Sequence, residues 1–239
     1  MFYVESNSSN PYYQLALEEY IFTHLDPSAE YCLLWQSRNT LYVARNQNTA
    51  EEIDQAFVDS AGVRVARRLS GGDAVYLDDD NLAFTYIAGR NTDPDSIRTR
   101  FSEAVVQTLA ELDIPVEESD GILTIQGKRF SDSARFISHG RMIYHGYVRL
   151  DSDPRKLLKA LQKKSRTENP VLFPTTSVNA HAPHRITYQT FKTILKRHLF
   201  DKHTETYTLT ASDKEAVLTL LDEKYETWEW NYTIPSVSR

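Results

Sequence analysis

The feature that most constrains the fold is a run of closely spaced strand-forming segments at residues 121–150, GILTIQGKRFSDSARFISHGRMIYHGYVRL. It is rich in β-branched and aromatic residues, and the short turns QGK and SHG divide it into three segments. Strands joined by such short turns pair with each other in antiparallel order. The run therefore predicts an antiparallel sheet, against which the rest of the chain packs.

The other segments predict helices placed between further groups of strands. Strands are expected at residues 1–5, 30–36, 40–45, 63–67, 74–77 and 82–88, with a hairpin turn, SRN, between the second and third of them. Helices are expected from Pro11 onward, capped by Asn10, and at residues 49–62, 93–113, 153–164, 187–199 and 211–224. Residues 164–185 and the aromatic tail from Tyr225 are expected to be irregular. This order favours an α+β fold with a mixed, mostly antiparallel sheet flanked by helices.

Composition narrows the class of protein. The 239 residues carry a formal net charge of −6, which argues against nucleic-acid binding because phosphate contacts need clustered Lys and Arg. No apolar stretch approaches the roughly 18 residues of a membrane-spanning helix, and the first residues do not resemble a secretory leader. The one cysteine, Cys32, lies in the apolar run YCLLW, which predicts a core thiol in a reducing compartment. We therefore expect a single cytoplasmic domain over residues 1–239.

Residues 67–80 combine arginines and glycines with an acidic run. Arg67-Arg68-Leu69-Ser70-Gly71-Gly72 predicts an anion-binding loop, because backbone N–H groups near glycines and a guanidinium together bind carboxylates or phosphates. A tight turn with surface arginines fits the same residues. Asp73 and Asp78-Asp79-Asp80 then either hold a divalent cation or, as the simpler interpretation, lie in a solvated hairpin turn.

A second polar segment is Gly127–Ala134, whose side chains alternate between two strand faces. One face is expected to carry Arg129, Ser131 and Ser133, and the other Lys128, Phe130 and Asp132. Cationic and hydroxyl groups on one face could line a polar pocket, although a solvated strand face is the alternative.

Two more segments are candidates for ligand binding. His145 lies in the strand segment YHGY, where a hydrogen-bonded core histidine is more common than a catalyst. Asn46 and Gln47 lie between a strand and a helix and could bind polar groups of a ligand. Thr49 as helix N-cap with Glu52 as its capping-box partner explains that segment more simply.

Six ordered segments together resemble the lipoate–protein ligase A family of the biotin/lipoate ligase superfamily. They are NPYYQLALEEY, LLWQSRNTLYVARNQNTAEEI, RRLSGGDAVYLDDDNLAFTYI, KRFSDSA, GRMIYHGYVRL and EKYETWEWNY. The resemblance covers nearly the whole chain and implies a biotin/lipoate ligase-like catalytic domain. The C-terminal accessory domain of longer members is expected to be absent.

In that family, ATP and lipoate form an enzyme-bound lipoyl adenylate, and the lipoyl group then passes to a lysine of an acceptor domain. The resemblance implies ATP and Mg²⁺ as cofactors and lipoate as substrate. It implies a lipoyl-acceptor domain as partner, of the dihydrolipoyl acyltransferase or glycine-cleavage H type. Some short relatives also need a separate accessory protein. Nucleic-acid and membrane partners are not expected.

The resemblance also assigns roles to residues. The expected catalytic set is Arg129, Lys128, Arg68 and His145. The expected substrate- and nucleotide-binding set is Asn46, Ser70, Gly71, Gly72, Asp73, Asp78, Asn81, Ser131 and Ser133. No resident metal site is predicted.

Several motif positions depart from the family pattern. They are Asp73 for glycine, Leu77 for histidine, Asp80 for glycine, Ala83 for asparagine, Arg129 for the essential lysine, Asp132 for glycine, Tyr144 for histidine and Tyr147 for threonine. A carboxylate about 4–5 Å from a bound phosphate would oppose binding by about 3–4 kcal/mol at an effective dielectric of about 20. Asp73 would also be strained if its position required a positive φ.

These departures leave two main hypotheses. The first is a working lipoate–protein ligase, or a lipoyltransferase that performs only the transfer step. The second is a pseudoenzyme that binds a lipoyl domain or lipoate without catalysis. An acyltransferase with a cysteine carrier is disfavoured, because Cys32 lies in an apolar strand away from the motifs.

Overall fold

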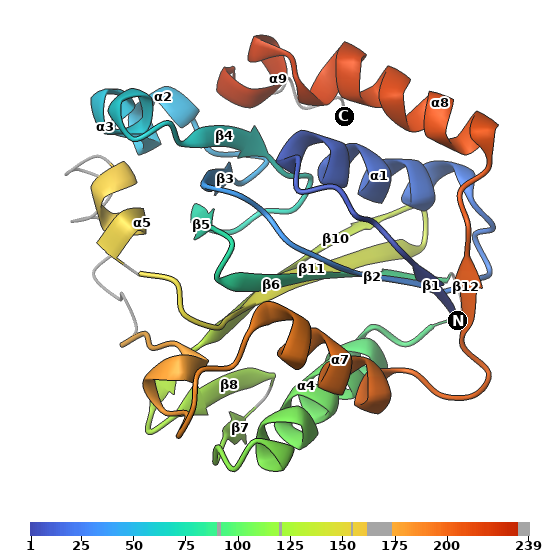
Figure 1. The fold of residues 1–239 in the computed structure, drawn as a ribbon. Coiled ribbons are helices and arrows are strands. Elements are labelled where there is room, and N and C mark those ends of the chain that lie inside the picture. The colour runs from blue at the N-terminus through green and yellow to red at the C-terminus, as the bar shows by residue number, and fades with distance from the viewer. Residues whose placement is uncertain (90–91, 120, 154, 162–173, 234–239) are drawn as a thin grey trace.

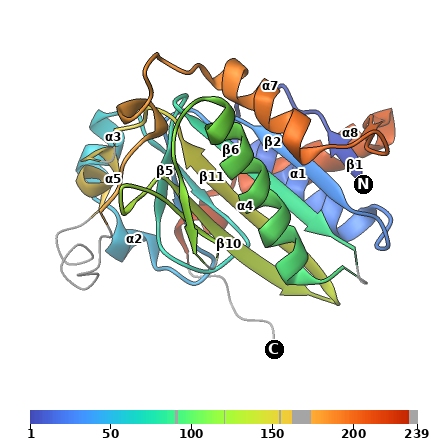
Figure 2. The same ribbon diagram turned by 90° about the horizontal axis from the view of Figure 1, so that it is seen from below.

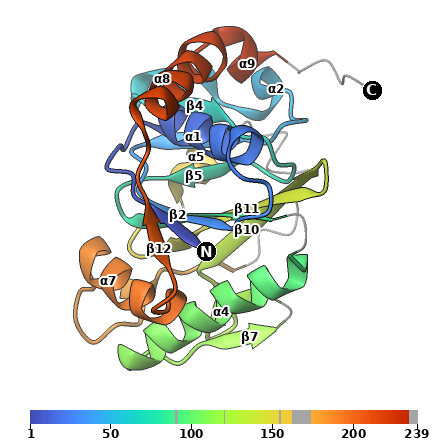
Figure 3. The same cartoon turned by 90° about the vertical axis from the view of Figure 1, so that its right-hand side faces the viewer.

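The computed structural model describes residues 1–89, 92–119, 121–153, 155–161 and 174–233. Its centre is a six-stranded sheet in the order β10–β11–β6–β2–β1–β12, with helices on both faces (Figure 1, Figure 3). The strands are β1 (Phe2–Val4), β2 (Tyr31–Trp35), β6 (Asn81–Ala88), β10 (Ser131–Ser138), β11 (Arg141–Arg149) and β12 (Glu205–Tyr207). Pairs among β10, β11, β6 and β2 are antiparallel, whereas β1 is parallel to β2 and β12. The expected α+β fold with a mixed, mostly antiparallel sheet is confirmed.

Helix α1 (Pro11–His24) covers one face of this sheet and carries α8 (Ala211–Leu220) on its outer side, whereas α4 (Pro94–Glu111) and α7 (Tyr188–Leu199) cover the other face (Figure 2). As expected, Asn10 caps α1, its side chain accepting a hydrogen bond from the backbone of Tyr12. Apolar side chains fill both helix–sheet interfaces. Phe84 of β6 stacks on Phe101 of α4, and both rings are buried. Each such ring stabilises the fold by about 1.5–3 kcal/mol.

A smaller sheet, in the order β4–β3–β5, lies beside the central one. It consists of β3 (Thr40–Val43), β4 (Arg64–Arg67) and β5 (Val75–Leu77), with α2 (Thr49–Glu52), α3 (Gln55–Ser60) and α5 (Arg155–Ala160) close by. A third sheet comprises β7 (Glu117–Ser119), β8 (Ile122–Ile125) and β9 (Lys128–Arg129). The short elements η1 (Val178–Ala180), η2 (Leu221–Tyr225) and α9 (Trp228–Tyr232) complete the described fold.

Two expected hairpins are wrong. β2 pairs with β1 and β6, whereas β3 pairs with β4 and β5, so residues 30–45 span two sheets. β5 and β6 also belong to different sheets, and Asp78–Asp80 form the crossing between them rather than a solvated hairpin turn. The reason is burial: β2 and β3 are buried along their whole length, so each takes neighbouring strands on both sides from distant segments.

The helix expected at residues 49–62 is two helices. Ile53 is extended and pairs with Leu161, and the Asp54 side chain caps α3 by accepting from the Phe57 backbone at 3.0 Å. The predicted Thr49 cap is also wrong. Asn48 is the N-cap residue of α2, and the Thr49 hydroxyl instead donates to the carbonyl of residue 231.

The predicted irregular tail contains the short helix α9, whose cap residue Thr227 accepts from the backbone of Trp230. Of the expected irregular segment 164–185, residues 162–173 lie outside the described part, and residues 174–185 are irregular apart from η1. Cys32 is fully buried, as predicted, and burial raises the pKa of its thiol. Within the described residues, every helix is too short or too polar to cross a bilayer.

Candidate active site

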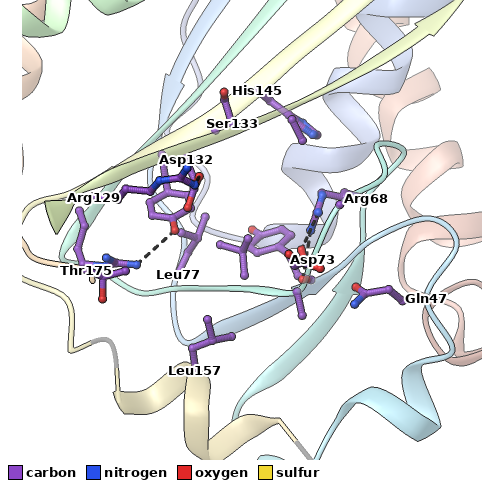
Figure 4. Close-up of a pocket in the computed structure, with 18 of the residues that line it drawn as sticks. Gln47, Arg68, Asp73, Leu77, Arg129, Asp132, Ser133, His145, Leu157 and Thr175 are labelled. Carbon is purple, nitrogen blue, oxygen red and sulfur yellow. Dashed lines mark hydrogen bonds and ion pairs between the residues drawn. The ribbon is translucent and has the colours of Figure 1, made fainter. Parts of the chain in front are cut away.

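A cavity of about 620 Å³ lies between the central sheet, the smaller sheet and α5 (Figure 4). Its apolar wall consists of Leu15, Trp35, Tyr42, Val75, Leu77, Tyr147, Leu157, Leu158 and Leu161. Its charged wall consists of Glu52, Arg68, Asp73, Arg129, Asp132 and Arg149. The cavity can therefore take a ligand that has both an apolar and an anionic part.

Arg67 holds the frame of the cavity and does not line it. Its side chain is fully buried in the fold, whereas a surface position was one reading of the sequence. Its guanidinium donates to the carbonyls of residues 44, 45 and 47, to the carbonyls of residues 230 and 231, and to the Thr49 hydroxyl. It thereby ties β4 to the loop after β3 and to α9.

Arg68 lines the cavity and also shapes its own loop. Its Nε donates to Ser70 Oγ at 2.9 Å, and its Nη2 donates to the carbonyls of Gly71 and Asp73 at 2.9 and 2.7 Å. Nη1 donates to the Tyr42 carbonyl at 3.3 Å. Burial lowers the pKa of Arg68 to about 10, so the side chain remains a cation at neutral pH. The guanidinium therefore fixes the loop and gives the cavity a positive charge.

The backbone of this loop needs glycine at position 72. Gly72 has a φ of +101°, in the left-handed range, and a Cβ there would lie 3.2 Å from Arg68 Nη2. Asp73 is not among the described residues with a positive φ. The exchange of the family's glycine for Asp73 therefore adds a charge to the cavity wall without backbone strain.

His145 is the centre of a buried hydrogen-bonded chain. Its Nε2 lies 2.6 Å from Ser70 Oγ, and its Nδ1 lies 3.0 Å from the carboxylate of Glu18, on α1. The other carboxylate oxygen of Glu18 accepts from the Thr85 hydroxyl, and that hydroxyl accepts from the indole N–H of Trp35 at 3.0 Å. Ser70, Glu18, Thr85 and His145 are all buried.

Both ends of this chain are obligatory donors, and the Glu18 carboxylate inside it is an obligatory acceptor. Arg68 and Trp35 can only donate, and the Glu18 carboxylate can only accept. The pattern is satisfied when His145 carries its proton on Nδ1 and accepts the hydroxyl hydrogen of Ser70 at Nε2. Serine, histidine and a carboxylate also form nucleophile triads, but the Ser70 hydroxyl is inaccessible and bound by Arg68, so here the chain positions the loop.

The 128–134 segment does not alternate as a single strand. β9 ends at Arg129, Phe130 turns into the core with no exposed surface, and β10 begins at Ser131. Arg129, Asp132 and Ser133 consequently all line the cavity, so the expected separation of Arg129 and Asp132 onto opposite faces is wrong. Arg129 Nη1 lies 3.7 Å from Asp132 Oδ1. Figure 4 shows this pair on the wall across from Arg68 and Asp73.

The other predicted residues of this segment lie elsewhere. Lys128 is exposed and outside the cavity lining. The Ser131 hydroxyl donates to the carbonyl of Tyr147 at 2.8 Å and thus joins β10 to β11. Arg149, which was not singled out from the sequence, lines the cavity and donates to the Tyr147 hydroxyl at 3.2 Å.

The acidic run is engaged in ion pairs rather than facing the cavity. Asp78 is buried, accepts from Asn81 at 2.8 Å and pairs with Lys156 of α5 at 3.1 Å. Asp79 pairs with Arg38, and Asp80 with Arg185. Across the described residues, no group of three or more His, Cys, Asp or Glu side chains is arranged to hold a metal ion. Asp78 thus fastens α5, a wall of the cavity, to the β5–β6 crossing.

The predicted binding residues therefore divide into two groups. Arg68, Gly72, Asp73, Arg129, Ser133 and His145 line the cavity, whereas Asn46, Lys128, Asp78, Asn81, Ser70, Gly71 and Ser131 do not. Gln47 lines the cavity in place of its neighbour Asn46. Sequence reasoning missed Glu18 and Arg149, but both carried a signal. Glu18 lies three residues from Leu15 and from Ile21 on the helix, and Arg149 shares a strand face with His145.

The α+β fold, with a cavity that has an apolar wall and a charged wall, is that of a catalytic domain of the biotin/lipoate ligase type, as the comparisons with known proteins show. Residues 10–200 match the model of the lipoyl protein ligase A/B catalytic domain, and the chain belongs to this family. It is 33% identical over 242 residues to lipoate–protein ligase LplJ of Bacillus subtilis, covering 97% of this chain and 73% of the relative. Lipoate–protein ligase 1 of Staphylococcus aureus is 31% identical with the same coverage.

Solved structures agree on the fold. The bipartite lipoate protein ligase of Thermoplasma acidophilum, studied with its E2 lipoyl domain, has a TM-score of 0.83 at 22% identity and covers 98% of this chain and 96% of its own. A lipoate–protein ligase A structure bound with ATP has a TM-score of 0.79 at 20% identity, with 98% of each chain covered.

Proposed function

We propose that the chain is a lipoate–protein ligase, which activates lipoate with ATP as lipoyl adenylate and transfers the lipoyl group to a lysine. The observation that carries this proposal is the cavity whose walls are apolar on one side and bear guanidinium groups on the other. Burial favours an aliphatic tail, and guanidinium groups favour its carboxylate. The names of the curated relatives support the proposal, as do the fold neighbours solved with lipoic acid and with ATP.

In the first step, a carboxylate oxygen of lipoate attacks the α-phosphorus of ATP. An acyl–phosphate bond forms, the α–β phosphoanhydride bond breaks, and pyrophosphate leaves. Because both reactants are anions, the positive charges of Arg68, Arg129 and Arg149 lower the cost of bringing them together. At 4 Å and an effective dielectric of about 20, one such charge contributes about 4 kcal/mol.

Mg²⁺ is assigned no protein site. The sequence candidates for metal binding are Asp73 and Asp78–Asp80. Asp78, Asp79 and Asp80 are held by Lys156, Arg38 and Arg185, and Asp73 lines the cavity without belonging to a group of three potential ligands among the described residues. The described residues thus do not offer a prepared ligand set, and we propose that Mg²⁺ enters with the triphosphate.

In the second step, the amine of the acceptor lysine attacks the acyl carbonyl carbon and AMP leaves. The proposed acceptor is a lipoyl domain of the dihydrolipoyl acyltransferase or glycine-cleavage H type, since a fold neighbour was studied with an E2 lipoyl domain. We propose that residues 1–239 act as one catalytic domain. A separate accessory protein and a cytoplasmic location stay predictions.

The balance of charge in the cavity favours a second candidate, a pseudoenzyme that binds a lipoyl domain or lipoate without catalysis. Among the described lining residues, Arg68, Arg129 and Arg149 are opposed by Glu52, Asp73 and Asp132. Carboxylates so placed weaken the attraction for a triphosphate. This candidate predicts binding of the acceptor domain with no heat of binding for ATP.

The test is the intact mass of an acceptor lipoyl domain after incubation with the chain. One reaction contains lipoate and ATP, and a second contains only lipoyl adenylate. A ligase lipoylates the acceptor in both, and a transfer-only enzyme does so only in the second. If the folded chain leaves the acceptor unmodified in both reactions, the ligase proposal is rejected.

Neighbouring cations provide a matched pair of variants. Arg129→Ala removes the guanidinium that lines the cavity and is expected to lower lipoylation at least about 100-fold, the typical loss of one charge-stabilising group. Lys128→Ala removes an exposed charge one residue earlier and is expected to retain activity. Loss of activity in Lys128→Ala alone would assign the essential cation to Lys128.

A further inference from the structure

Asp132 is a carboxylate placed in the charged wall of the cavity by the pairing of β10 with β11. Asp132 is the pairing partner of Tyr147 in this sheet, and Ser133 is the partner of Gly146. Gly146 permits a close approach, because a Cβ at that position would lie 2.2 Å from the Asp132 carbonyl oxygen. Half of the Asp132 side-chain surface is exposed, and the residue lines the cavity. The backbone therefore presents this carboxylate to the cavity at a defined place.

Asp132 does not suit the first half of the proposed reaction. Lipoate and ATP are both anions, and an additional carboxylate beside them raises the cost of binding. Arg129, whose Nη1 lies 3.7 Å from Asp132 Oδ1, and Arg149 oppose this charge, but both are also the cations that the anionic substrates would need.

The second half of the reaction is different, because its incoming reactant is a cation. The ε-ammonium of a lysine must lose a proton before its nitrogen can attack a carbonyl carbon. We propose that Asp132 is the catalytic residue that binds the ammonium of the acceptor lysine and accepts its proton during lipoyl transfer. This inference rests on the proposed ligase function, because it needs an acyl adenylate in the cavity.

The transfer step exchanges the acyl–phosphate bond for an amide bond. The Asp132 carboxylate takes one proton from the ammonium, and the neutral amine forms a C–N bond to the acyl carbon. The bond from that carbon to the phosphate oxygen breaks, its electron pair leaves with AMP, and the second proton of the nitrogen passes to solvent. Asp132 then releases its proton to solvent and returns to the carboxylate, so the products are the lipoyl amide, AMP and two protons.

The surroundings of Asp132 fit a proton acceptor. The charged and titratable groups that face it are Arg129 from β9, Arg149, Tyr147 and Tyr144 from β11, and Asp73 across the cavity. Partial desolvation within the cavity raises the pKa of the Asp132 carboxyl above the ordinary value, against the opposing effect of the arginines. A carboxylate of raised pKa accepts a proton more readily than an ordinary one. Asp132 is also the cavity carboxylate in contact with Arg129, the residue at the family's lysine position.

The experiment measures the two half-reactions separately in Asp132→Asn. Transfer is followed by acceptor mass with supplied lipoyl adenylate, and adenylation by pyrophosphate release from ATP and lipoate. We expect transfer to fall about 100-fold, the usual contribution of a positioned proton acceptor. We expect the KM for ATP to fall about tenfold, or about 1.4 kcal/mol, because a negative charge has been removed. If Asp132 only supported the structure, its substitution would not weaken transfer and at the same time improve the binding of ATP.

Two control variants accompany the test. Asp132→Glu keeps the carboxylate and should retain most of the transfer activity. Asp59→Asn removes a negative charge from the exposed surface of α3, outside the cavity lining, and should change neither half-reaction.

The pH profile of transfer gives an independent readout. In the native chain the reactive pair, ionised Asp132 with the lysine ammonium, has a constant population between their two pKa values, so the rate is flat there. In Asp132→Asn the rate follows the fraction of neutral lysine and rises about tenfold per pH unit below the lysine pKa of about 10.4.

Two results overturn the inference while leaving the proposed function standing. One is transfer by Asp132→Asn within about threefold of the native rate, far less than a lost proton acceptor costs. The other is an equal loss in both half-reactions. A native chain that performs neither half-reaction rejects the proposed function and this inference with it.

Discussion

Replacing Glu18 by glutamine tests whether the buried chain around His145 has the direction inferred from its donors and acceptors. The Glu18 carboxylate accepts from His145 Nδ1 on one side and from the Thr85 hydroxyl on the other. Glutamine has the same shape but must turn its NH₂ group toward one of these two partners. The substitution therefore changes the hydrogen-bond pattern with little change in packing.

Either orientation of the glutamine leaves a buried hydroxyl hydrogen without its present acceptor. If the NH₂ group faces His145, the ring must carry its proton on Nε2, and the Ser70 hydroxyl loses that acceptor. If it faces Thr85, the hydroxyl of Thr85 loses Glu18, while it still accepts from Trp35. A buried donor left unsatisfied costs about 1–3 kcal/mol, and we expect Glu18→Gln to lose that much free energy of unfolding.

Urea unfolding measures the loss, and ¹⁵N chemical shifts of the His145 ring report which nitrogen carries the proton. Glu103→Gln, on the exposed surface of α4, is the matched control and should be neutral. The reasoning is refuted if two results occur together. The free energy of unfolding of Glu18→Gln would lie within about 0.5 kcal/mol of the native value, which is below the cost of an unsatisfied buried donor, and the His145 proton would stay on Nδ1.

Two further substitutions test the framework. Arg67→Lys should cost at least about 3 kcal/mol in urea unfolding, because one ammonium cannot replace a buried guanidinium that satisfies several carbonyls. Asp213 accepts from Tyr20, Tyr207 and the Thr210 backbone; burial raises its pKa, but these hydrogen bonds hold it below the ordinary 3.8. Its contribution is therefore complete above pH 3.8 and lost as pH falls through the folded pKa. Asp213→Asn should lose about 2 kcal/mol of the free energy of unfolding at pH 7. Urea unfolding at several pH values should also show a smaller decrease of that free energy in acid than in the native chain.

Local signals were sufficient for much of the fold. Two neighbouring residues predict the start of α1: the Asn10 side chain caps the helix, and Pro11 is its first residue. The strands β10 and β11 follow from their composition and the short turn between them. Such features depend on contacts a few residues apart, which a sequence displays directly.

Pairing between distant segments could not be predicted from such local patterns. The turn at residues 37–39 has the composition of a hairpin, yet β2 and β3 enter different sheets because both are buried along their length. The same limit applies to the 128–134 segment. Phe130 enters the core, and this resets the alternation and brings Arg129 and Asp132 onto one wall. Core packing therefore overrode the period of a strand.

The acidic residues near the candidate site also could not be placed from the local sequence alone. Asp73, Asp78, Asp79 and Asp80 form one acidic cluster in the sequence, which predicts a joint effect on a bound phosphate. In the fold the chain crosses between sheets at Asp78, and only Asp73 of the four lines the cavity. Repulsion of a nucleotide must therefore be assessed from Asp73 with Asp132 and Glu52, which come from three separate segments. Asp78 acts instead through Lys156, because their ion pair holds α5 over the apolar wall.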